Sequence, residues 1–367
     1  MIKSIKILHI SSAISWRGGE QQIANLVEGL KIVNKEVKQI VFCAKNSAIE
    51  NYLEENNINF ISEKKRSAVS FFFIKSLYKC IKTFEPDIIH IHDSHAHTAC
   101  VIAHFLGKFK TPIVLHRRVD FKVKRSFFSN FKYKYNYIKK VISVSEAIKN
   151  IIHPNVKAPI EVIYSSWRRA SISIAGVIDL KKELGISESS KLVGNISALV
   201  DHKDYPTFIK TASKIITLYS DIHFVIVGEG ELRETIEKKI KSLGLDNKIH
   251  LLGFRKDIVE IMKSLDIFFM PSKMEGLGSI IYTAFGCRIP VVATNTGGIP
   301  ELIKHNSTGY LADTGDYSTL SNLILEVLEN KRPLITENAH KLALENLYVN
   351  MAESTYKVYL DLLDYKN

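Results

Sequence analysis

Ten short apolar runs recur along the chain, and amphipathic stretches with a helical period separate them. The runs span residues 5–11, 37–44, 87–92, 112–116 and 140–145 in the first half and 191–199, 223–230, 248–254, 267–272 and 290–294 in the second. Runs that are short and apolar throughout are typical of strands buried on both faces of a parallel sheet. Their alternation with helices predicts an α/β fold built on doubly wound parallel sheets.

Two sheets are expected, because the scheme occurs twice and 367 residues exceed the size at which a single core usually splits. We predict an N-terminal Rossmann-like domain over residues 1–168 and a C-terminal one over residues 169–345. Residues 165–176 show neither period and are predicted to carry the crossover, and the helical tail at 346–367 is expected to pack back on the first domain. Ligands of such sheets bind beyond the carboxyl ends of the strands, so we expect the functional residues there, at a central cleft.

The composition is that of a soluble globular protein, with 46% hydrophobic and 24% charged residues. No apolar run approaches the roughly 20 residues that a membrane-spanning helix needs, and the N-terminus turns polar too soon for a signal peptide. We therefore expect a cytoplasmic protein. The four cysteines form no Cys-x-x-Cys pair, which predicts reduced thiols rather than disulfides or a zinc site.

Glycine and histidine residues gather where the strands of the first half end. Gly18 and Gly19 open a helix, and paired glycines let the backbone approach an anion closely, although a plain tight turn has the same signature. The segment HIHDSHAHT, residues 90–98, closes one strand and His116 closes another. We expect these side chains to bond hydroxyl or phosphate groups; a structural histidine is the alternative at each position.

Zinc binding is the other interpretation of the histidine segment, because His90, His92, His95 and His97 are close in sequence. His90 and His92 share one face of a strand whose end we expect to be buried, and no carboxylate beyond Asp93 completes a ligand set. We therefore expect no metal.

Strand-end loops of the second half carry a cation, a carboxylate and glycines. Lys203 offers a point charge suited to phosphate. Gly276 and Gly278 would open a helix whose backbone N–H groups hold a diphosphate, and Glu275 beside them would bond sugar hydroxyls. Taken alone, each feature also fits a solvated lysine or an ordinary helix start.

Taken in order, these segments resemble the retaining glycosyltransferases of family 4, which have the GT-B architecture. The matching segments include GGEQQIANL, PDIIHIHDSHAH, PIVLH and VISVSEAIK in the first half and NISALVDHKDYPTFIKTA, FVIVGEGEL, DIFFMPSKMEGLG and RIPVVATNTGGIPELI in the second. The resemblance implies transfer of a sugar from a nucleotide-diphosphate sugar, with retention at the anomeric carbon. It places the donor mainly on the C-terminal domain and the acceptor mainly on the N-terminal domain.

The resemblance also implies roles for individual residues. Glu275, His116 and Lys203 are implied as catalytic, with His116 near the transferred sugar and Lys203 on the diphosphate. The donor-binding set implied is Gly18, Gly19, Lys203, Phe254, Arg255, Glu275, Gly276, Leu277, Gly278 and Thr283, of which Phe254 and Arg255 flank the base. On the acceptor side we expect Asp93, His95, Arg117 and Arg118.

Two positions depart from the family pattern. Ala198 stands where the family has an arginine five residues before the phosphate lysine, and Thr283 stands where it has the second glutamate of Glu-x7-Glu, which holds the ribose. Each lost charge-assisted hydrogen bond costs about 1.5–3 kcal/mol if nothing compensates, or roughly ten- to hundredfold in donor affinity. Arg255, Lys256 or His202 would supply a replacement cation. We therefore expect these two departures to change how the donor is bound, and we do not expect them to abolish activity.

Many nucleotide-sugar transferases hold the diphosphate with a metal at an Asp-x-Asp motif, which this sequence lacks. The helix terminus and Lys203 would replace that metal, so we predict metal-independent transfer with no cofactor besides the nucleotide sugar. The resemblance implies front-side displacement, in which the leaving phosphate takes the proton of the acceptor hydroxyl.

Positive charge is concentrated in the first half. Residues 1–170 hold 28 Lys and Arg against 13 Asp and Glu, a net of +15, and the remaining residues hold 22 against 25, a net of −3. Segments 64–84 and 117–140 combine cations with Phe and Tyr, a composition that fits contact with anionic lipid. We expect a peripheral enzyme of the inner membrane face, with a lipid-linked glycan or lipopolysaccharide core as acceptor. The alternative is a solvated face with its aromatics in the core, and no nucleic-acid motif is present.

Two rival functions share this architecture. A nucleotide-sugar 2-epimerase would need acids that shuttle protons, for which Asp93, Glu275 and Glu301 are the candidates. A catalytically silent GT-B subunit that binds a partner transferase is favoured by Ala198 and Thr283. The retained Glu275 and both glycine loops favour a transferase over either rival.

Overall fold

The computed structural model describes residues 4–67, 69–121, 123, 126–169, 176, 178–330 and 332–364. The chain divides into two compact units: Met1–Ser166 with Asn346–Asn367 (unit 1) and Trp167–Glu345 (unit 2). This division falls two residues before the predicted boundary at 168. Half of the predicted crossover at 165–176, residues 170–175, lies outside the described residues.

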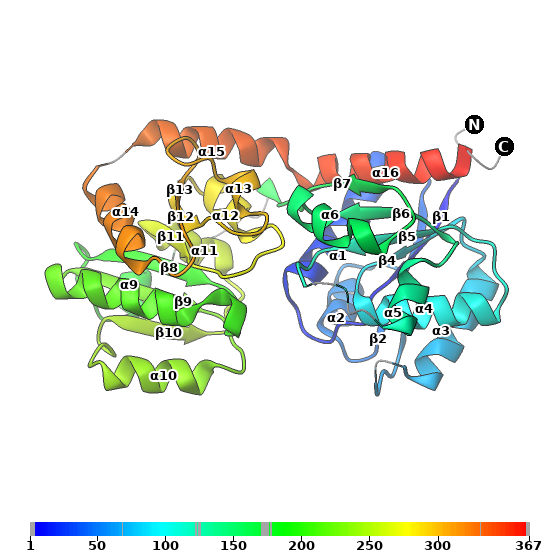
Figure 1. The fold of residues 1–367 in the computed structure, drawn as a ribbon, viewed down its shortest axis with the longest axis horizontal. Coiled ribbons are helices and arrows are strands. Elements are labelled where there is room, and N and C mark those ends of the chain that lie inside the picture. Colours follow the sequence, from blue (N-terminus) through cyan, green and yellow to red (C-terminus); the bar gives the residue numbers. More distant parts are fainter. Residues whose placement is uncertain are drawn as a thin grey trace. The chain divides into compact units, whose positions relative to one another are not determined.

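Unit 1 contains a parallel sheet of seven strands, as the alternation predicted (Figure 1). The strands are β1 Lys6–Ile10, β2 Lys38–Ala44, β3 Phe60–Glu63, β4 Ile88–Ile91, β5 Ile113–Arg117, β6 Ile138–Ser143 and β7 Ile160–Val162. Their order is β3-β2-β1-β4-β5-β6-β7, so the direction of winding reverses between β1 and β4. This reversal is the switch point at which doubly wound sheets bind their ligands.

Helices cover both faces of this sheet. Their bounds are α1 Gly18–Val33, α2 Ala48–Glu55, α3 Phe71–Phe84, α4 Ser94–Leu106, α5 Phe127–Tyr133, α6 Glu146–Ile152 and α16 Tyr348–Asp364. Alternate residues along the strands face two different cores: one packs on α3 and α4, and the other on α1 and α16. The sheet is therefore buried on both sides, which explains why its central strands are mostly apolar.

The C-terminal helix α16 packs against α1 of unit 1, so the predicted return of residues 346–367 to the first domain agrees with the structure. A Cβ at Gly29 of α1 would lie 2.6 Å from the Cβ of Ala352, so the close crossing requires glycine there. Asn34 donates from Nδ2 to the Tyr356 hydroxyl over 2.7 Å at the same contact. The apolar side of α16 thereby closes the core over β1, β4 and β5.

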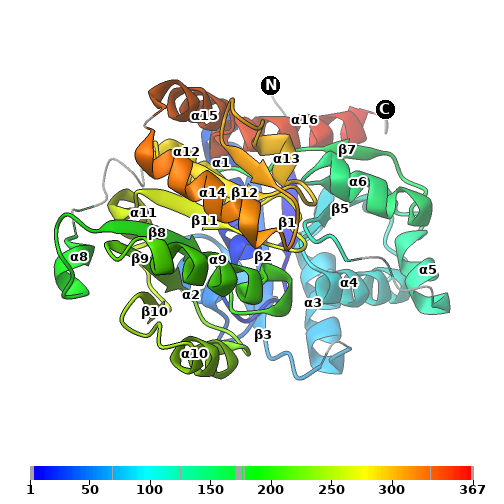
Figure 2. The same cartoon turned by 60° about the vertical axis from the view of Figure 1, so that its left-hand side comes forward.

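Unit 2 repeats the design with a parallel sheet of six strands (Figure 2). The strands are β8 Lys191–Ile196, β9 Ile222–Val227, β10 Ile249–Gly253, β11 Ile267–Met270, β12 Val291–Thr294 and β13 Tyr310–Ala312. The order β10-β9-β8-β11-β12-β13 puts the switch point between β8 and β11. Two Rossmann-like parallel-sheet units confirm the predicted fold class.

The helices of unit 2 also lie on both faces of its sheet. Their bounds are α8 Leu180–Glu183, α9 Tyr205–Leu218, α10 Arg233–Ser242, α11 Ile258–Ser264, α12 Ile280–Gly286, α13 Ile299–Leu302, α14 Tyr317–Glu329 and α15 Pro333–Glu345, with a 3₁₀ turn η2 at Asp201–Lys203. Helices α9, α10 and α14 bury their apolar sides in one core, and α11, α12 and α15 pack together elsewhere in the unit. Within the described residues, no helix has the length and apolarity required to cross a membrane. The four cysteines are free thiols, three of them buried.

Candidate functional site

A half-buried ion pair lies where the strands beside the unit 2 switch point end. Lys203, in the turn η2 that follows β8, pairs through Nζ with Oε2 of Glu275, in the loop that follows β11. The two side chains are only 13% and 15% exposed. The predicted phosphate lysine and sugar carboxylate therefore meet at one point, although 72 residues separate them.

Backbone contacts hold the Glu275 loop in place. A Cβ on Gly297, which has a φ of +53°, would lie 1.9 Å from the Glu275 carbonyl oxygen. Gly298 donates its N–H to that same oxygen over 3.0 Å. Lys273 donates its N–H to the His202 carbonyl over 2.8 Å, which joins this loop to the turn that carries Lys203. Gly297 and Gly298 of the segment TNTGGIP therefore have a packing role here. Because they lack side chains, the backbone of the Glu275 loop can come into contact with theirs.

The donor-binding residues predicted after Glu275 are mostly enclosed. Gly276, Leu277 and Gly278 are buried, and Thr283 is half-buried. Helix α12 begins at Ile280, so the prediction that the helix opens at the glycines is wrong by about one turn. Gly278 has a φ of +80°, a left-handed conformation that favours a loop at this position. Thr283 therefore lies in the first turn of α12, and not two turns into a helix as the sequence predicted.

The Arg255 guanidinium already forms ion pairs with two carboxylates. Its guanidinium pairs with Asp257 over 2.6 Å and with Glu183 over 2.5 Å. These contacts, Asp257 foremost, raise the pKa of Arg255. It is therefore a poor replacement for the cation missing at Ala198. Phe254, the preceding residue, is 60% exposed, so a planar ligand can stack on its ring.

The glycine loop of unit 1 opens α1. Arg17 is the N-cap residue, and its N–H donates to Oε2 of Glu20 over 2.9 Å. Burial raises the pKa of Glu20. A Cβ at Gly19 would meet no atom within 4 Å outside its own helix backbone and chain neighbours. There is therefore open space beside Gly19 at the N-terminus of α1.

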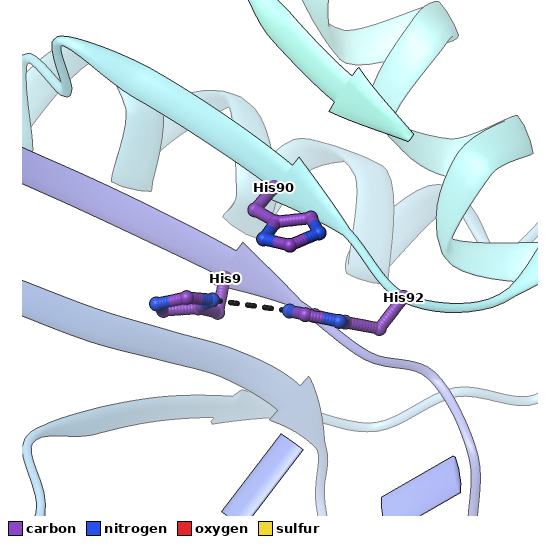
Figure 3. A group of neighbouring side chains, drawn as sticks. All are labelled: His9, His90 and His92. Atoms are coloured by element: carbon purple, nitrogen blue, oxygen red, sulfur yellow. Dashed lines mark hydrogen bonds between the residues drawn. The ribbon is translucent and has the colours of Figure 1, made fainter. Parts of the chain in front are cut away.

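Four histidines gather on one face of the unit 1 sheet, at its switch point. His9 of β1 is the register partner of His90 of β4, and His92 follows two residues later on the same face. Figure 3 shows these three rings together, with Nδ1 of His9 lying 3.0 Å from Nε2 of His92. The ring of His116, from β5, is parallel to that of His90 at a centroid distance of 5.4 Å.

Arg118 fixes the tautomers of this cluster. Its Nη2 lies 3.1 Å from Nδ1 of His92 and 3.1 Å from Nδ1 of His116, and a guanidinium only donates. Both neutral rings must therefore carry their proton on Nε2. His92 then donates to His9, and His9 donates from its own Nε2 to Gln39 Oε1 over 3.3 Å.

This hydrogen-bond pattern bears on metal binding. His9, His90 and His92 offer ring nitrogens that all lie within 4.8 Å of one another, a spacing that allows a shared ion. With Arg118 donating to Nδ1, however, Nε2 of His92 bears a proton and has no lone pair for a metal. The positive charge of Arg118 opposes a cation as well. The arrangement favours a hydrogen-bonded cluster.

The structure separates the four histidines considered as a zinc set. His90 and His92 join the cluster, His95 is exposed, and His97 is buried with Nε2 3.0 Å from the Lys132 carbonyl. His9 was missed, because one histidine inside an apolar run gives no signal. Nε2 of His90 and Nε2 of His116 are both buried without a hydrogen-bond partner among the described residues.

The residues predicted for the acceptor take different roles. Asp93 caps α4, accepting at Oδ1 from the N–H groups of His95 and Ala96 over 3.0 and 2.9 Å. Arg117 is buried and donates to the Tyr133 hydroxyl over 3.0 Å, on the opposite side of β5 from His116. Arg118 instead donates hydrogen bonds to His92 and His116 of the histidine cluster. His95 alone is exposed at the edge of the sheet.

Comparison with known proteins extends over nearly the whole chain. The model of the family described as Glycosyltransferase Family 4 matches residues 16–166, and the model of the family described as Glycosyl transferases group 1 matches residues 177–345. A Bacillus anthracis N-acetyl-alpha-D-glucosaminyl L-malate synthase is 28% identical, with 77% of this chain and 76% of the relative covered. An Escherichia coli UDP-Gal:alpha-D-GlcNAc-diphosphoundecaprenol alpha-1,3-galactosyltransferase is 26% identical, with 89% of each covered. The structure of Anabaena Alr3699/HepE in complex with UDP-glucose superposes with a TM-score of 0.83 at 23% identity, covering 97% of this chain and 100% of that one.

Proposed function

Since this chain belongs to the family 4 glycosyltransferases and has the GT-B fold, we propose that it transfers a sugar from a nucleotide-diphosphate sugar to a glycan or lipid-linked acceptor, with retention of configuration. The family makes it a nucleotide-sugar glycosyltransferase. The name of the Escherichia coli relative, a UDP-Gal-dependent transferase that acts on a diphosphoundecaprenol-linked sugar, supports UDP as the nucleotide of the donor and a lipid-linked glycan as the acceptor.

The Lys203–Glu275 pair carries this proposal. Breaking the bond between sugar and diphosphate places negative charge on the leaving phosphate and positive charge on the sugar ring. Lys203 offsets the first charge, and Glu275 holds the sugar through its hydroxyls. In this structure the two opposite charges pair with each other in a half-buried loop.

The same face of the sugar is attacked and vacated in this scheme. The bond from the anomeric carbon to the phosphate oxygen breaks as the bond to the acceptor oxygen forms. The acceptor proton passes to the leaving phosphate, so the protein need not supply a base. Burial and then the Arg118 charge lower the pKa of His116 well below the usual range, which favours the neutral ring. That ring is suited to donating a hydrogen bond from Nε2, because Nδ1 accepts from Arg118.

Metal-independent transfer is part of the proposal. Lys203 and the backbone around Gly276 to Gly278 take the place of a cation, and no Asp-x-Asp motif occurs in the sequence. Transfer is therefore expected to persist in excess EDTA. Restoration of activity by Mg²⁺ or Mn²⁺ after EDTA treatment would contradict this part.

A membrane-bound acceptor is supported by the surface of α3, α4 and α5, which are neighbours in unit 1 (Figures 1 and 2). Their exposed phenylalanines are Phe71, Phe72, Phe105, Phe127, Phe128 and Phe131. Segment 64–84 holds six Lys and Arg and no acidic residue. Exposed aromatic rings among lysines fit the headgroup layer of an anionic bilayer. We therefore place the enzyme at the inner membrane face.

Sedimentation with liposomes tests the membrane part. The wild type should bind anionic vesicles at moderate salt, and Phe127→Ser with Phe128→Ser should weaken that binding. Leu334→Ser is the control, since Leu334 is also an exposed apolar side chain but lies on unit 2. Equal binding by all three proteins, or none by the wild type, would contradict a membrane contact through these helices.

A panel of nucleotide sugars analysed by mass spectrometry and NMR tests the reaction. Hydrolysis or transfer that yields the α-anomer from an α-linked donor supports a retaining transferase. A change of sugar stereochemistry with the nucleotide intact would indicate an epimerase. That outcome is disfavoured, because Asp93 is engaged by its cap and Glu275 by Lys203. Absence of any donor binding would indicate a silent subunit.

A further inference from the structure

The backbone ladder between β11 and β12 ends just before the loop that carries Glu275. Its last register pair is Met270 with Ala293. The residue that follows Met270 is Pro271, which has no N–H group and cannot continue the ladder. The carbonyl groups of residues 272–275 therefore find their hydrogen-bond donors outside the regular sheet.

Three donors at alternate positions at and after the end of β12 take over from the ladder. The pairs of donor and acceptor are the Thr294 hydroxyl with the Ser272 carbonyl over 2.6 Å, the Thr296 hydroxyl with the Lys273 carbonyl over 2.9 Å, and the Gly298 N–H with the Glu275 carbonyl over 3.0 Å. Thr294 is buried and Thr296 is half-buried. Two of the three donors are therefore side-chain hydroxyls, which a substitution can remove without changing the backbone.

The N–H groups of the same loop bond to a different element, the turn η2 that carries Lys203. Lys273 and Met274 both donate to the His202 carbonyl, over 2.8 and 3.4 Å. The loop is thus bonded through its carbonyls to the segment after β12 and through its N–H groups to η2. The position of the Glu275 carboxylate against the Lys203 ammonium therefore depends on the hydrogen bonds at both elements.

The Thr296 hydroxyl bonds to this loop and leaves the helix that follows it in sequence without a hydroxyl cap. A threonine at a helix start usually accepts a hydrogen bond from the first turn with its hydroxyl. Here the N-cap residue of α13 is Gly298, which has no side chain, and Ile299 donates its N–H to the backbone carbonyl of Thr296 over 3.1 Å. The Thr296 hydroxyl donates to Lys273 instead, so its contact is with the loop that carries Glu275.

We propose that Thr294 and Thr296 are positioning residues of the transfer reaction, whose hydroxyls hold the loop so that the Glu275 carboxylate lies correctly for the donor sugar. The inference rests on the proposed function, because it concerns the same site. Both hydroxyls act through Glu275 and are spent on its loop. A group that contacts the reacting sugar must be held closely by the hydrogen bonds behind it, since a small displacement lowers the rate of the reaction.

Turnover of a UDP-sugar by Thr296→Val tests the proposal, because valine has the shape of threonine and lacks the hydroxyl. The kcat should fall about tenfold, the loss of one hydrogen bond, and Thr296→Ser, which keeps the hydroxyl, should retain it. Thr308→Val is the matched control. The Thr308 hydroxyl also donates to a carbonyl over 2.9 Å, that of Leu302, and is also half-buried, in a loop that carries none of the residues assigned to the donor. The control should lose a similar amount of Tm and keep its turnover.

A double substitution separates positioning from a general loss of stability. In a Glu275→Ala background, Thr296→Val should cost no further turnover, because its effect passes through the carboxylate that has been removed. The same cost in both backgrounds would overturn the proposal. So would an equal loss of turnover in Thr308→Val.

Hydrogen exchange gives a result that does not depend on activity. The amides of residues 273–275 should exchange faster in Thr296→Val than in the wild type, and at the wild-type rate in Thr308→Val. Unchanged exchange in Thr296→Val would overturn the proposal. If the wild type turns over no nucleotide sugar, the transferase function fails, and the exchange rates still decide whether the Thr296 hydroxyl holds the Glu275 loop.

Discussion

The guanidinium of Arg118 lies 3.1 Å from Nδ1 of His116, and this contact determines which nitrogen of that histidine bears the proton. His116 presents Nε2–H, which is buried and has no partner among the described residues. Arg118 is thus a positioning residue for a neutral donor, which gives it a role different from the acceptor contact expected from the sequence.

Nitrogen chemical shifts of labelled histidine provide the first test. His116 should be neutral at pH 7 with Nε2 protonated, and Arg118→Met should mix the two tautomers because the fixed donor is lost. His153, which is exposed, serves as the reference ring. A wild-type His116 that is protonated on Nδ1 would show that the hydrogen-bond assignment is wrong.

Thr283→Glu should tighten UDP binding. The side chain lies in the first turn of α12, half-buried, at the position where the family holds ribose. A carboxylate there adds one charge-assisted hydrogen bond, worth about tenfold in Kd. Thr283→Gln, of equal length but uncharged, is the control for size. An unchanged UDP affinity with reduced turnover would mean that Thr283 lies near the reacting bond instead.

Gly297→Ala should damage both stability and donor binding. The new Cβ would lie 1.9 Å from the Glu275 carbonyl oxygen, so the loop that carries the carboxylate must move. Gly315→Ala is a matched control, because Gly315 also has a positive φ but a Cβ there meets nothing within 4 Å. The control should lose only about 1 kcal/mol, or roughly 2–4 °C in Tm. Equal effects of the two variants on UDP affinity would refute the close-approach argument.

Stability of the protein should fall as the pH drops from about 6.5 toward 4. Burial lowers the pKa of His9 to about 4 and that of His97 to about 3. Below the unfolded-state pKa of about 6.5 the unfolded chain binds protons that the folded chain refuses, so the free energy of unfolding decreases by up to about 1.4 kcal/mol per pH unit for each such histidine. Urea unfolding at several pH values measures this slope.

Two substitutions sharpen the pH experiment. His97→Gln should reduce the slope, because one buried titrating ring is removed. His153→Gln should leave it unchanged, since that side chain is exposed. A slope that is the same in wild type and His97→Gln would mean that other groups govern the acid sensitivity.

The central strands could be predicted from the sequence because their residues are mostly apolar on both faces. Each of the ten predicted runs contains a strand. It missed β3, β7 and β13, which have only three or four residues each. Edge strands such as Phe60–Glu63 and Ile160–Val162 are only partly buried, so no apolar run marks them.

The functional residues also fall into a group that the sequence predicted and a group that it missed. Lys203 and Glu275 were predicted from motifs, and the structure brings them into contact. His9 was not predicted, because its meeting with His92 depends on β1 lying beside β4 across 83 positions of sequence. Such contacts follow from the strand order, which the sequence pattern alone does not specify.

The central claim is that Lys203 and Glu275 form the donor end of a sugar-transfer site. The decisive measurement is turnover of a UDP-sugar by the wild type, Lys203→Met and Glu275→Gln. Lys191→Met is the control, because it breaks a 2.9 Å ion pair with Asp266 at the opposite ends of β8 and β11. We predict losses on the order of a hundredfold in the two site variants and unchanged turnover in the control. Wild-type turnover that survives both Lys203→Met and Glu275→Gln would contradict the account.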